Sequence, residues 1–525
     1  MARVIGIDLG TTNTLAAWAD GRVPRIIPTE RGHNLVPSVV AITGGRIVVG
    51  HPAREQLLIH PASTITGSKR LLGRPFGSPI VQRLKRKLAW EVVEGAQGTA
   101  AARLPNEGGS EVHELTDISA VLLQQIARYA EAHLGGPVDG AVISVPAYYP
   151  LTQREAVRTA ARTAGLDVWR LVNEPTAAAL AYGIGRSVNQ KLLVFDLGGG
   201  TFDVSVLKVH SGTFQVLATG GDGALGGVDF DIRLCDHLLD RFEQENGISV
   251  RDDPVVVQRV LFAAETAKQD LSLLQHTEVR LPFVREKRGR PIDLALHVSR
   301  MQLVKLTEDL IERASRAVDS VLEQAGLSYR DIDEVLLAGG QTRMPAIHQR
   351  LERQFGRPPR RGVNPDEVVA QGAALLARSL STSSVQLYDV LSLPVGIVAV
   401  DKLGALRVQT VLPRNAQLPI EVTIDVVTGP SRRVDLYQLP STDETDPALC
   451  EPLGGVLLVD RKPGDPVRLT LRIDADARLQ VRDGSRVLEL RAGRVVDDGG
   501  LLKSPKTDPR APVATAGLLG RLFRR

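Results

Sequence analysis

The sequence contains little cysteine and few aromatic residues. Among 525 residues there are two cysteines, and Phe, Trp and Tyr together account for 4%. The two cysteines, Cys235 and Cys450, argue against a disulfide framework or a cysteine-based metal site and fit a reducing compartment. No apolar run reaches the roughly 18 residues of a membrane-spanning helix. No signal peptide precedes the apolar run Val4 to Asp8, so we expect a cytoplasmic protein.

A strong excess of charge is also lacking. The 64 Lys and Arg residues nearly balance the 60 Asp and Glu residues, which leaves a net charge of +4. Basic and aromatic residues are not interleaved, so nucleic acid is disfavoured as a partner. The length and the 43% hydrophobic content indicate a globular protein of two or more domains.

Two segments repeat one pattern. Ile5 to Asn13 (IGIDLGTTN) and Leu192 to Asp203 (LLVFDLGGGTFD) each place Asp-Leu-Gly and then Gly and Thr after an apolar run. The run is typical of a buried strand, and glycine lets the following backbone approach an anion closely. One such turn alone is commonly structural, but the matched pair predicts a nucleotide clamp. The predicted phosphate loops are Gly10, Thr11 and Thr12 in the first copy and Gly198, Gly199, Gly200 and Thr201 in the second.

Three carboxylates accompany these turns. Asp8 and Asp196 lie near the ends of the two predicted strands, and Asp203 follows shortly after the second turn. Phosphate groups bound with magnesium need such carboxylates, usually through water because Mg²⁺ loses its waters reluctantly. The sequence therefore predicts a hydrated magnesium site.

Alternating strand-like and helical patterns up to about Leu380 predict an α/β fold with largely parallel sheets. Leu115 to Leu134 has helical periodicity, Gly140 to Val145 is a predicted strand, and Thr152 to Ala164 is a second predicted helix. The stretch Glu94 to Ser110 is rich in Gly and Ala, which predicts a loop insertion.

The pattern changes after a run of small polar residues, Ser379 to Ser384, which predicts a hinge. Beyond it, apolar and polar residues alternate, as in Ile420 to Val426 and Val467 to Ile473, which indicates an antiparallel β-sandwich. The predicted organisation is a nucleotide-binding domain at 1–380, a linker at 381–392, a sandwich at 393–492 and a basic, disordered tail at 493–525. The end of the tail, Gly517 to Arg525, would permit contact with an anionic membrane, although a solubilising tail is the simpler interpretation.

Seven segments resemble the ATPase domain of the Hsp70 (DnaK) chaperones, in the same order and over residues 2–380. They read IGIDLGTTN, ITGSKRLLG, VPAYYPLTQREA, LVNEPTAAALAYG, FDLGGGTFDVSVL, AGGQTRMP and VNPDEVVAQGAA. The resemblance implies an actin-like duplicated fold with two lobes, ATP or ADP with Mg²⁺ in the cleft, and hydrolysis of ATP to ADP and phosphate. It also explains the internal repeat.

The resemblance assigns roles to individual residues. Lys69 matches the lysine that positions the attacking water and stabilises charge on the γ-phosphate, and Glu174 matches a carboxylate of the same catalytic group. Such roles suit a lysine point charge and a water-orienting carboxylate. Without the resemblance, Lys69 would be interpreted as a solvated surface lysine. The implied catalytic set is Lys69, Glu174, Thr201, Asp8 and Asp196, and Gly226 and Gly227 join the nucleotide-binding residues.

For the nucleoside, Glu265, Lys268 and Ser272 have the spacing of one helical face. The resemblance implies that they contact ribose and adenine, whereas an exposed ion-paired stripe is the alternative. The opposite wall is implied to consist of Gly339, Gly340, Arg343 and Asp366, where the arginine can stack on the base.

Other positions match groups that couple the nucleotide to partners. Pro146 and Arg154 match a proline switch and its arginine, and Arg170 and Asp389 match groups that contact J-domain cochaperones and dock the linker. The implied partners are unfolded or extended polypeptide, a J-domain cochaperone and a nucleotide-exchange factor.

The sequence also departs from the family pattern. Gln386 interrupts the apolar linker, which is expected to weaken its docking, and Val228 stands where the family has an acid. Only about 35 residues follow the last predicted strand near Leu490, fewer than a helical lid over bound peptide needs, so we expect faster peptide release.

Two functions remain open on this basis. The first is an ATP-hydrolysing chaperone that couples nucleotide state to peptide binding in the sandwich. The second is a nucleotide-dependent scaffold or regulator that binds one dedicated partner. An actin-like sugar kinase or filament protein is disfavoured because Lys69, the Pro146 switch and the β-module occur together.

Overall fold

The computed structural model describes residues 2–21, 23–106, 108–183, 189–360, 362–382, 385–400 and 405–491. The chain separates into two compact units. Among the described residues, the first unit contains the chain up to Leu393 with the short segments Arg414–Leu418 and Ala475–Ala477, and the second contains Pro394–Pro413, Pro419–Asp474 and the chain from Arg478 to Arg491. The predicted tail at 493–525 lies outside the described residues. Among the described helices, none is long and apolar enough to cross a membrane.

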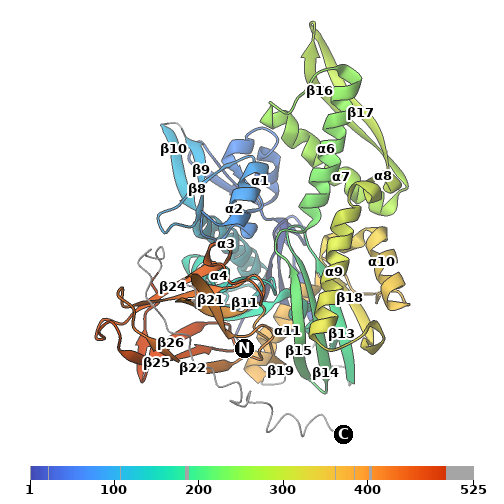
Figure 1. Cartoon of the computed structure of the whole chain (residues 1–525). Helices are drawn as coiled ribbons and strands as arrows, with labels where there is room; N and C mark the ends of the chain where they lie inside the picture. The colour runs from blue at the N-terminus through green and yellow to red at the C-terminus, as the bar shows by residue number, and fades with distance from the viewer. Residues whose placement is uncertain are drawn as a thin grey trace. The chain divides into compact units, whose positions relative to one another are not determined.

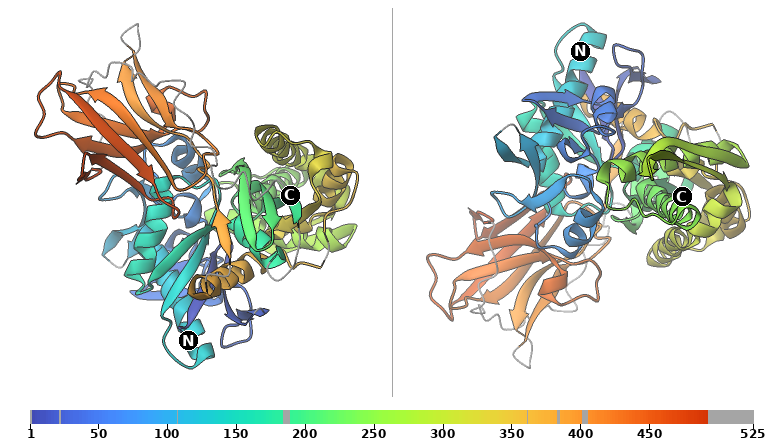
Figure 2. Two further views of the ribbon diagram at one scale, coloured as in Figure 1. Left: turned by 90° about the horizontal axis from the view of Figure 1, so that it is seen from below. Right: turned by 90° about the horizontal axis from the view of Figure 1, so that it is seen from above.

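The first unit is built on two sheets, one in each of two lobes, which Figure 2 shows side by side from below and from above. The sheet of the first lobe has the strand order β12-β11-β1-β2-β3, with β4 paired to β2. Its strands are β1 (Val4–Leu9), β2 (Asn13–Asp20), β3 (Val23–Ile27), β4 (Val36–Pro37), β11 (Gly140–Val145) and β12 (Val168–Asn173). The helices α3 (Leu115–Leu134) and α4 (Leu151–Thr163) belong to this lobe, close to their predicted bounds.

The sheet of the second lobe has the order β18-β13-β14-β15-β19. Its strands are β13 (Asn189–Leu197), β14 (Phe202–His210), β15 (Thr213–Asp222), β18 (Glu334–Ala338) and β19 (Gln386–Tyr388). The repeated sequence is thus a repeated structure: β1 and β13 each lead through a glycine-containing turn into an antiparallel strand and pair in parallel with a later strand. Figure 1 shows β13, β14 and β15 with α9 (Glu308–Gln324) against them.

Helices α5 (Glu174–Gly183) and α11 (Val368–Thr382) pack together at glycine. A Cβ on Gly372 would lie 1.7 Å from the carbonyl oxygen of Ala177, and one on Gly6 would lie 2.1 Å from the backbone nitrogen of Ala374. These contacts require glycine because the facing atoms are backbone atoms. They hold α11 against both α5 and β1.

Three expectations about this unit need correction. Its sheets are mixed rather than largely parallel, because short turns join β1 to β2 and β13 to β14 and such turns produce antiparallel pairs. The hinge predicted at Ser379 is helical, since α11 continues to Thr382. Part of the predicted linker forms β19, which pairs in parallel with β15.

The predicted loop insertion at Glu94 to Ser110 is also wrong. The region forms a three-stranded sheet of β8 (Glu91–Glu94), β9 (Ala100–Asn106) and β10 (Gly109–Glu114). Its alanines, Ala100 to Ala102, are at most 1% exposed. Burial of these small side chains in the core outweighs the low intrinsic strand preference of alanine.

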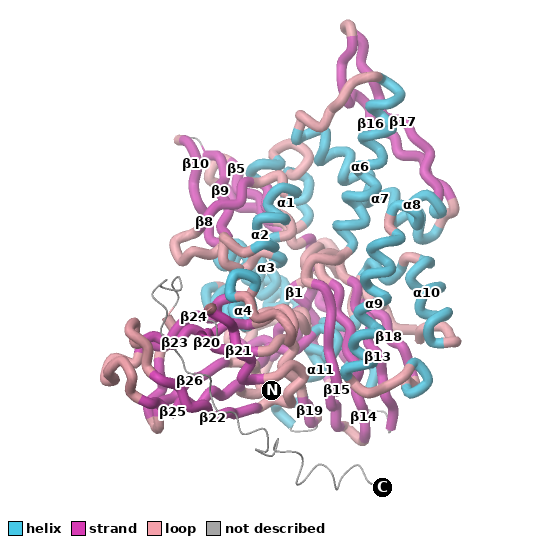
Figure 3. The backbone as a smooth tube through the Cα atoms, in the orientation of Figure 1, coloured by secondary structure: helices cyan, strands magenta, loops and turns pink. Residues whose placement is uncertain are grey.

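The remaining elements of the first unit surround the two sheets. A long hairpin of β16 and β17 lies beside α7 and extends beyond the helices in Figure 3. The other elements are β5 (Val40–Thr43), β6 (Arg46–Val49), β7 (Thr64–Ile65), α1 (His51–Gln56), α2 (Pro79–Leu84), α6 (Gly227–Asn246), α7 (Pro254–Leu273), β16 (His276–Lys287), β17 (Arg290–Ser299), α8 (Arg300–Leu306) and α10 (Pro345–Phe355).

The second unit contains two four-stranded sheets, β21-β20-β23-β24 and β22-β25-β26-β27, whose strand pairs are antiparallel. The alternation read from the sequence is present: Ile424 and Val426 are buried, whereas Thr423 and Asp425 are exposed. The architecture agrees with the predicted β-sandwich. Its strands are β20 (Val395–Val400), β21 (Leu406–Leu412), β22 (Ile420–Val427), β23 (Arg433–Gln438), β24 (Glu451–Leu457), β25 (Pro466–Ile473), β26 (Leu479–Asp483) and β27 (Arg486–Leu488).

Candidate functional site

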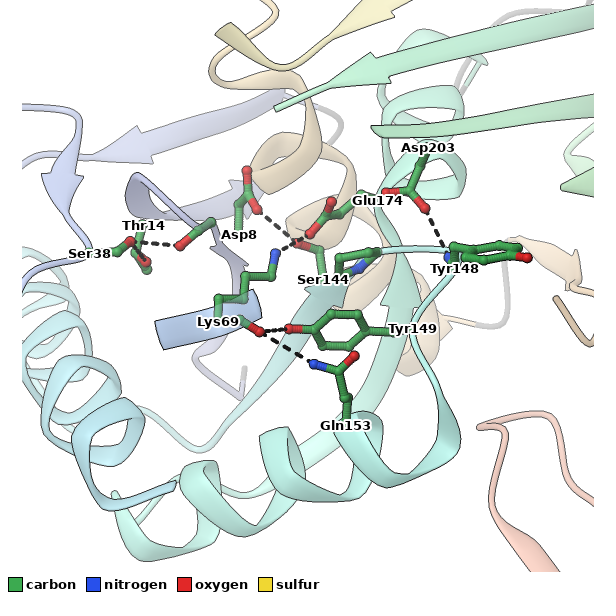
Figure 4. A network of polar contacts seen from close by, with 12 residues as sticks. Asp8, Thr14, Ser38, Lys69, Ser144, Tyr148, Tyr149, Gln153, Glu174 and Asp203 are labelled. Atoms are coloured by element: carbon green, nitrogen blue, oxygen red, sulfur yellow. Dashed lines mark hydrogen bonds and ion pairs between the residues drawn. The ribbon is translucent and has the colours of Figure 1, made fainter. Parts of the chain in front are cut away.

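Four carboxylates, Asp8, Asp196, Asp203 and Glu174, lie close enough where the two lobes meet to influence the pKa of Asp196. Figure 4 shows three of them, Asp8, Glu174 and Asp203. Asp196 on β13 and Asp203 on β14 are directly opposed, because the turn at Gly198 to Thr201 reverses the chain between them. Asp8 comes from β1 of the other lobe, and its Oδ1 accepts a hydrogen bond from Ser144 Oγ at 3.0 Å. Glu174 begins α5.

The cluster carries more negative charge than its surroundings neutralise. Burial and the neighbouring Glu174 charge raise the pKa values of Asp8 and Asp203 to about 7. Burial, followed by the charge of Glu174, raises the pKa of Asp196 well above its usual value. Buried carboxylates that repel one another in this way bind cations or protons readily.

Lys69 is the cation that faces this cluster. It lies in the 3₁₀ turn η2 (Ser68–Arg70), and its Nζ is 2.6 Å from Glu174 Oε1. Both side chains are buried, so the interpretation of Lys69 as a solvated surface lysine is wrong. Burial is the largest single influence and lowers the pKa of Lys69, but the charge and hydrogen bond of Glu174 together with the charges of neighbouring groups, Asp8 among them, outweigh it and the pKa is raised. Lys69 therefore keeps its charge.

The two predicted phosphate loops touch. A Cβ on Gly199 would lie 1.9 Å from Thr12 Oγ1, and one on Gly200 would lie 2.5 Å from Thr11 Cγ2. The first loop is braced by Ser38, whose hydroxyl donates to the carbonyl of Gly10 at 2.7 Å. The two repeated turns, one from each lobe, thus lie in contact and form one continuous surface of loop residues.

The predicted nucleoside residues meet around Gly227. A Cβ there would lie 3.0 Å from Lys268 Nζ on α7 and 3.1 Å from Gln341 Oε1 in the turn η5 (Gly340–Arg343). Lys268 Nζ donates to the Gly227 carbonyl at 3.0 Å. On the η5 side, Arg343 pairs with Asp366 at 2.5 Å. The structure therefore brings Lys268 of α7 and Gln341 of η5 together at Gly227. Of the other predicted residues on α7, Glu265 pairs with Arg54 at 2.7 Å and Ser272 donates to the Lys268 carbonyl at 3.3 Å. Gly340 follows Gly339 at the start of η5, and a Cβ on Gly340 would lie 2.9 Å from Asp366 Oδ1.

Two acids near these residues were not predicted. Asp229 Oδ2 accepts from the backbone N–H of Gly226 at 3.1 Å and lies 3.2 Å from Arg70 Nη2, and Asp231 pairs with Lys268 at 2.9 Å. Val228 contributes through its backbone, whose N–H donates to the Gly199 carbonyl at 2.9 Å. Asp229 and Asp231 follow Val228 on the same helix, α6. Their sequence positions carry no motif, so only the fold shows that they contact Arg70 and Lys268.

The predicted coupling residues are linked by a residue that the sequence analysis missed. Arg154 donates to the carbonyl of Pro146 at 3.4 Å and to Asn173 Oδ1 at 2.5 Å. The Nδ2 of Asn173 donates to Asp389 Oδ2 at 2.8 Å. Burial raises the pKa of Asp389. Arg170, three residues before Asn173, lies on the same strand, β12.

Docking of the linker strand tolerates its polar residue. Gln386 is exposed within β19, while Leu387 and Tyr388 are half-buried. The strand pairs from Gln386 to Tyr388 with Thr213 to Gln215 of β15. The backbone of the strand is therefore paired despite its polar residue, because ladder hydrogen bonds use main-chain groups. A weakening of the docking by Gln386 stays a prediction.

The first unit holds a duplicated strand-turn-strand unit, and one loop from each copy lies beside a buried cluster of carboxylates and a lysine. This arrangement defines a two-lobed nucleotide-binding protein of the actin-like class. The accompanying module is a β-sandwich. The chain belongs to the Hsp70 family, since the family model described as Hsp70 protein matches residues 4–482. Members of this family are nucleotide-binding chaperones that generally bind Mg²⁺ with the nucleotide.

The residues of this chain fit a hydrated magnesium ion. Four carboxylates lie together beside Lys69, and burial, followed by the charge of Glu174, raises the pKa values of the three aspartates. In the part of the chain that the structure describes, no three His, Cys, Asp or Glu side chains are placed to ligate one ion directly. Contact through water suits magnesium and this arrangement.

The raised pKa of Asp8 predicts a pH-dependent stability. Folding raises the pKa of Asp8 from 3.8 to about 7, so the folded state binds this proton more tightly than the unfolded state does. The contribution of Asp8 to the free energy of unfolding therefore falls as pH rises from about 4 to 7. Without nucleotide and magnesium, Asp8→Asn should unfold a few degrees above wild type at pH 8 and approach wild type at pH 5. Thermal unfolding at both values tests this, with the exposed Asp20→Asn as control. An increase in the unfolding temperature of Asp8→Asn that is the same at pH 5 and pH 8 would contradict this prediction.

Proposed function

We propose that the protein is an ATP-hydrolysing chaperone in which nucleotide state controls the binding of extended polypeptide. The observation that carries the hydrolytic part is the buried Lys69–Glu174 pair, 2.6 Å apart, beside the aspartates and the two phosphate loops. A binding site alone does not require a charged lysine held at such a position. A site that stabilises charge on a transferred phosphoryl group does.

The residues divide the chemistry among them. Lys69 supplies positive charge where negative charge develops on the γ-phosphate, and Glu174 holds its ammonium group in place and can orient the attacking water. Thr201 and the glycines beside it offer hydroxyl and N–H groups to the phosphates. A magnesium ion, held through water by Asp8, Asp196 and Asp203, would neutralise phosphate charge. On the nucleoside side, Lys268 and Arg343 are held in place by Asp231 and Asp366.

The coupling part of the proposal rests on the contacts of Asn173. Arg154 and Asp389 bind opposite ends of its carboxamide, so a change at Pro146 reaches the residue that follows the docked strand β19. A backbone with two arrangements at Pro146 would shift this chain of contacts. We propose that undocking of β19 reports nucleotide state, and that a J-domain cochaperone and an exchange factor act on this cycle.

Peptide binding tests the chaperone function. A labelled apolar heptapeptide should bind the intact protein, and ATP should weaken the binding by about 5-fold or more. Fluorescence anisotropy measures the dissociation constant of the peptide with ATP and without it, and a charged heptapeptide of equal length is the control. Asn173→Ala should bind the peptide but lose the effect of ATP, because the carboxamide that joins Arg154 to Asp389 is removed. Absence of binding in both states would contradict the chaperone and favour a scaffold that serves one dedicated partner.

We also propose that the protein is cytoplasmic. Cys235 and Cys450 are buried free thiols. Burial raises the pKa of Cys235 to about 12 and that of Cys450 to about 11, so both thiols stay protonated. These features agree with the cytoplasmic location expected from the sequence.

A further inference from the structure

We propose that Tyr149 and Gln153 are positioning residues that place Lys69 for ATP hydrolysis. The proposal rests on the ATPase activity inferred above and adds two residues to it. Neither residue faces the phosphate loops with its polar group. Both bind the main chain of Lys69 instead, as Figure 4 shows.

Lys69 lies in a short turn that another segment of the chain binds. The 3₁₀ turn η2 has three residues and starts after Gly67, which has a left-handed conformation with φ of 65°. Just after the turn, the backbone N–H groups of Leu71 and Leu72 donate to the carbonyl of Ser68 at 2.9 Å. Hydrogen bonds in 3₁₀ turns have poorer geometry than those in an α-helix, so contacts from outside add to the stability of the turn. The carbonyl of Lys69 receives that support from another segment of the chain.

That support comes from Tyr149 and the start of α4. The hydroxyl of Tyr149 donates to the Lys69 carbonyl, and Gln153 Nε2 lies 3.4 Å from the same oxygen and 2.9 Å from the carbonyl of Leu72. Gln153 is fully buried and Tyr149 is 3% exposed. Gly73 extends the contact, since a Cβ there would lie 2.6 Å from Ala156 Cβ on α4. Residues 69–73 are therefore seated on α4.

Tyr149 also contacts the charged end of Lys69. The Nζ atom lies 5.9 Å from the centre of the tyrosine ring, within the range of a cation–π interaction. Burial raises the pKa of Tyr149, so its hydroxyl stays protonated and remains a donor. One side chain thus fixes both the main chain and the ammonium group of Lys69.

The same tyrosine is held by the coupling residues. Arg154 Nε donates to the carbonyl of Tyr149 at 3.2 Å, and Arg154 also binds the carbonyl of Pro146. The preceding residue, Tyr148, donates its backbone N–H to Asp203 Oδ1 at 2.9 Å. A shift of the backbone at Pro146 would therefore move Lys69 relative to Asp203. Since small misplacements of a catalytic group slow a reaction strongly, Tyr149 links coupling to hydrolysis.

Tyr149→Phe tests the role because it removes only the hydroxyl. Single-turnover hydrolysis should slow about 3- to 10-fold, the range expected for one hydrogen bond. The affinity for ATP should stay within about 2-fold, since the hydroxyl binds Lys69 and not the nucleotide-binding loops. Gln153→Met should act in the same direction and serves as a second variant if the first fails to fold. Tyr329→Phe, which also removes a hydrogen-bonded hydroxyl, is the control and should leave the rate unchanged.

A double-mutant cycle separates positioning from general damage. In the Lys69→Ala background the main-chain contact persists but the ammonium group is absent, so Tyr149→Phe should cause no further slowing. Equal slowing in both backgrounds would overturn the proposal, as would equal rates for Tyr149→Phe and wild type. Wild-type protein that binds ATP without hydrolysing it would overturn the proposed ATPase and this role together, which distinguishes the two failures.

Discussion

Lys69→Ala should slow single-turnover ATP hydrolysis by about 10²- to 10³-fold, the usual cost of losing one preorganised electrostatic group. The buried ammonium group pairs with Glu174 at 2.6 Å and faces three aspartates whose pKa values are raised. Without it, charge that develops on the γ-phosphate loses its nearby ammonium group and stays close to the carboxylate of Glu174. Binding of ATP should persist, because the phosphate loops and the residues around Gly227 keep their own contacts.

The measurement is hydrolysis of radiolabelled ATP with the protein in excess, together with a separate titration of ATP binding. Thr201→Ala should also slow hydrolysis, since Thr201 lies in the second phosphate loop. Lys305→Ala, which removes an exposed lysine of α8, is the matched control. Unchanged hydrolysis in both Lys69→Ala and Thr201→Ala would refute the catalytic assignment.

The parts of the site that the sequence predicts are those in which local geometry demands a residue type. Asp8 and Asp196 lie near the ends of strands whose apolar runs are visible in the sequence, and Gly199 and Gly200 are needed for close approach. The bounds of α3 and β11 followed from periodicity and from the glycine and proline residues at their ends. These features are local, so one sequence suffices to find them.

The residues that the sequence could not predict act through contacts between distant segments. Asn173 joins Arg154 to Asp389, and Tyr149 and Gln153 hold a turn about 80 residues earlier in the chain. Asparagine, tyrosine and glutamine are ordinary at such positions, and only the fold gives them a role. The burial of Lys69 has the same origin, because α4 and Glu174 cover it from other parts of the chain.

Gly226→Ala should weaken ATP binding by about 10- to 100-fold, the equivalent of the 1 to 3 kcal/mol that overpacking costs. Gly226 has an extended backbone, so its own conformation would tolerate alanine. The new Cβ, however, would lie 2.5 Å from the Gly199 carbonyl oxygen and from the backbone of Gly200. Backbone atoms cannot rotate away, so the second phosphate loop must move.

That displacement also breaks the hydrogen bonds that join the loop to α6, in which Gly227 and Val228 donate to the carbonyls of Gly198 and Gly199 at 2.9 Å. Isothermal titration with ATP and magnesium measures the loss. Gly77→Ala is the control, because a Cβ on Gly77 meets no atom within 4 Å. The loss of affinity in Gly226→Ala should contrast with Lys69→Ala, which keeps ATP but hydrolyses it slowly. If Gly226→Ala binds ATP as tightly as Gly77→Ala, the turn at Gly198 to Thr201 does not hold the phosphates.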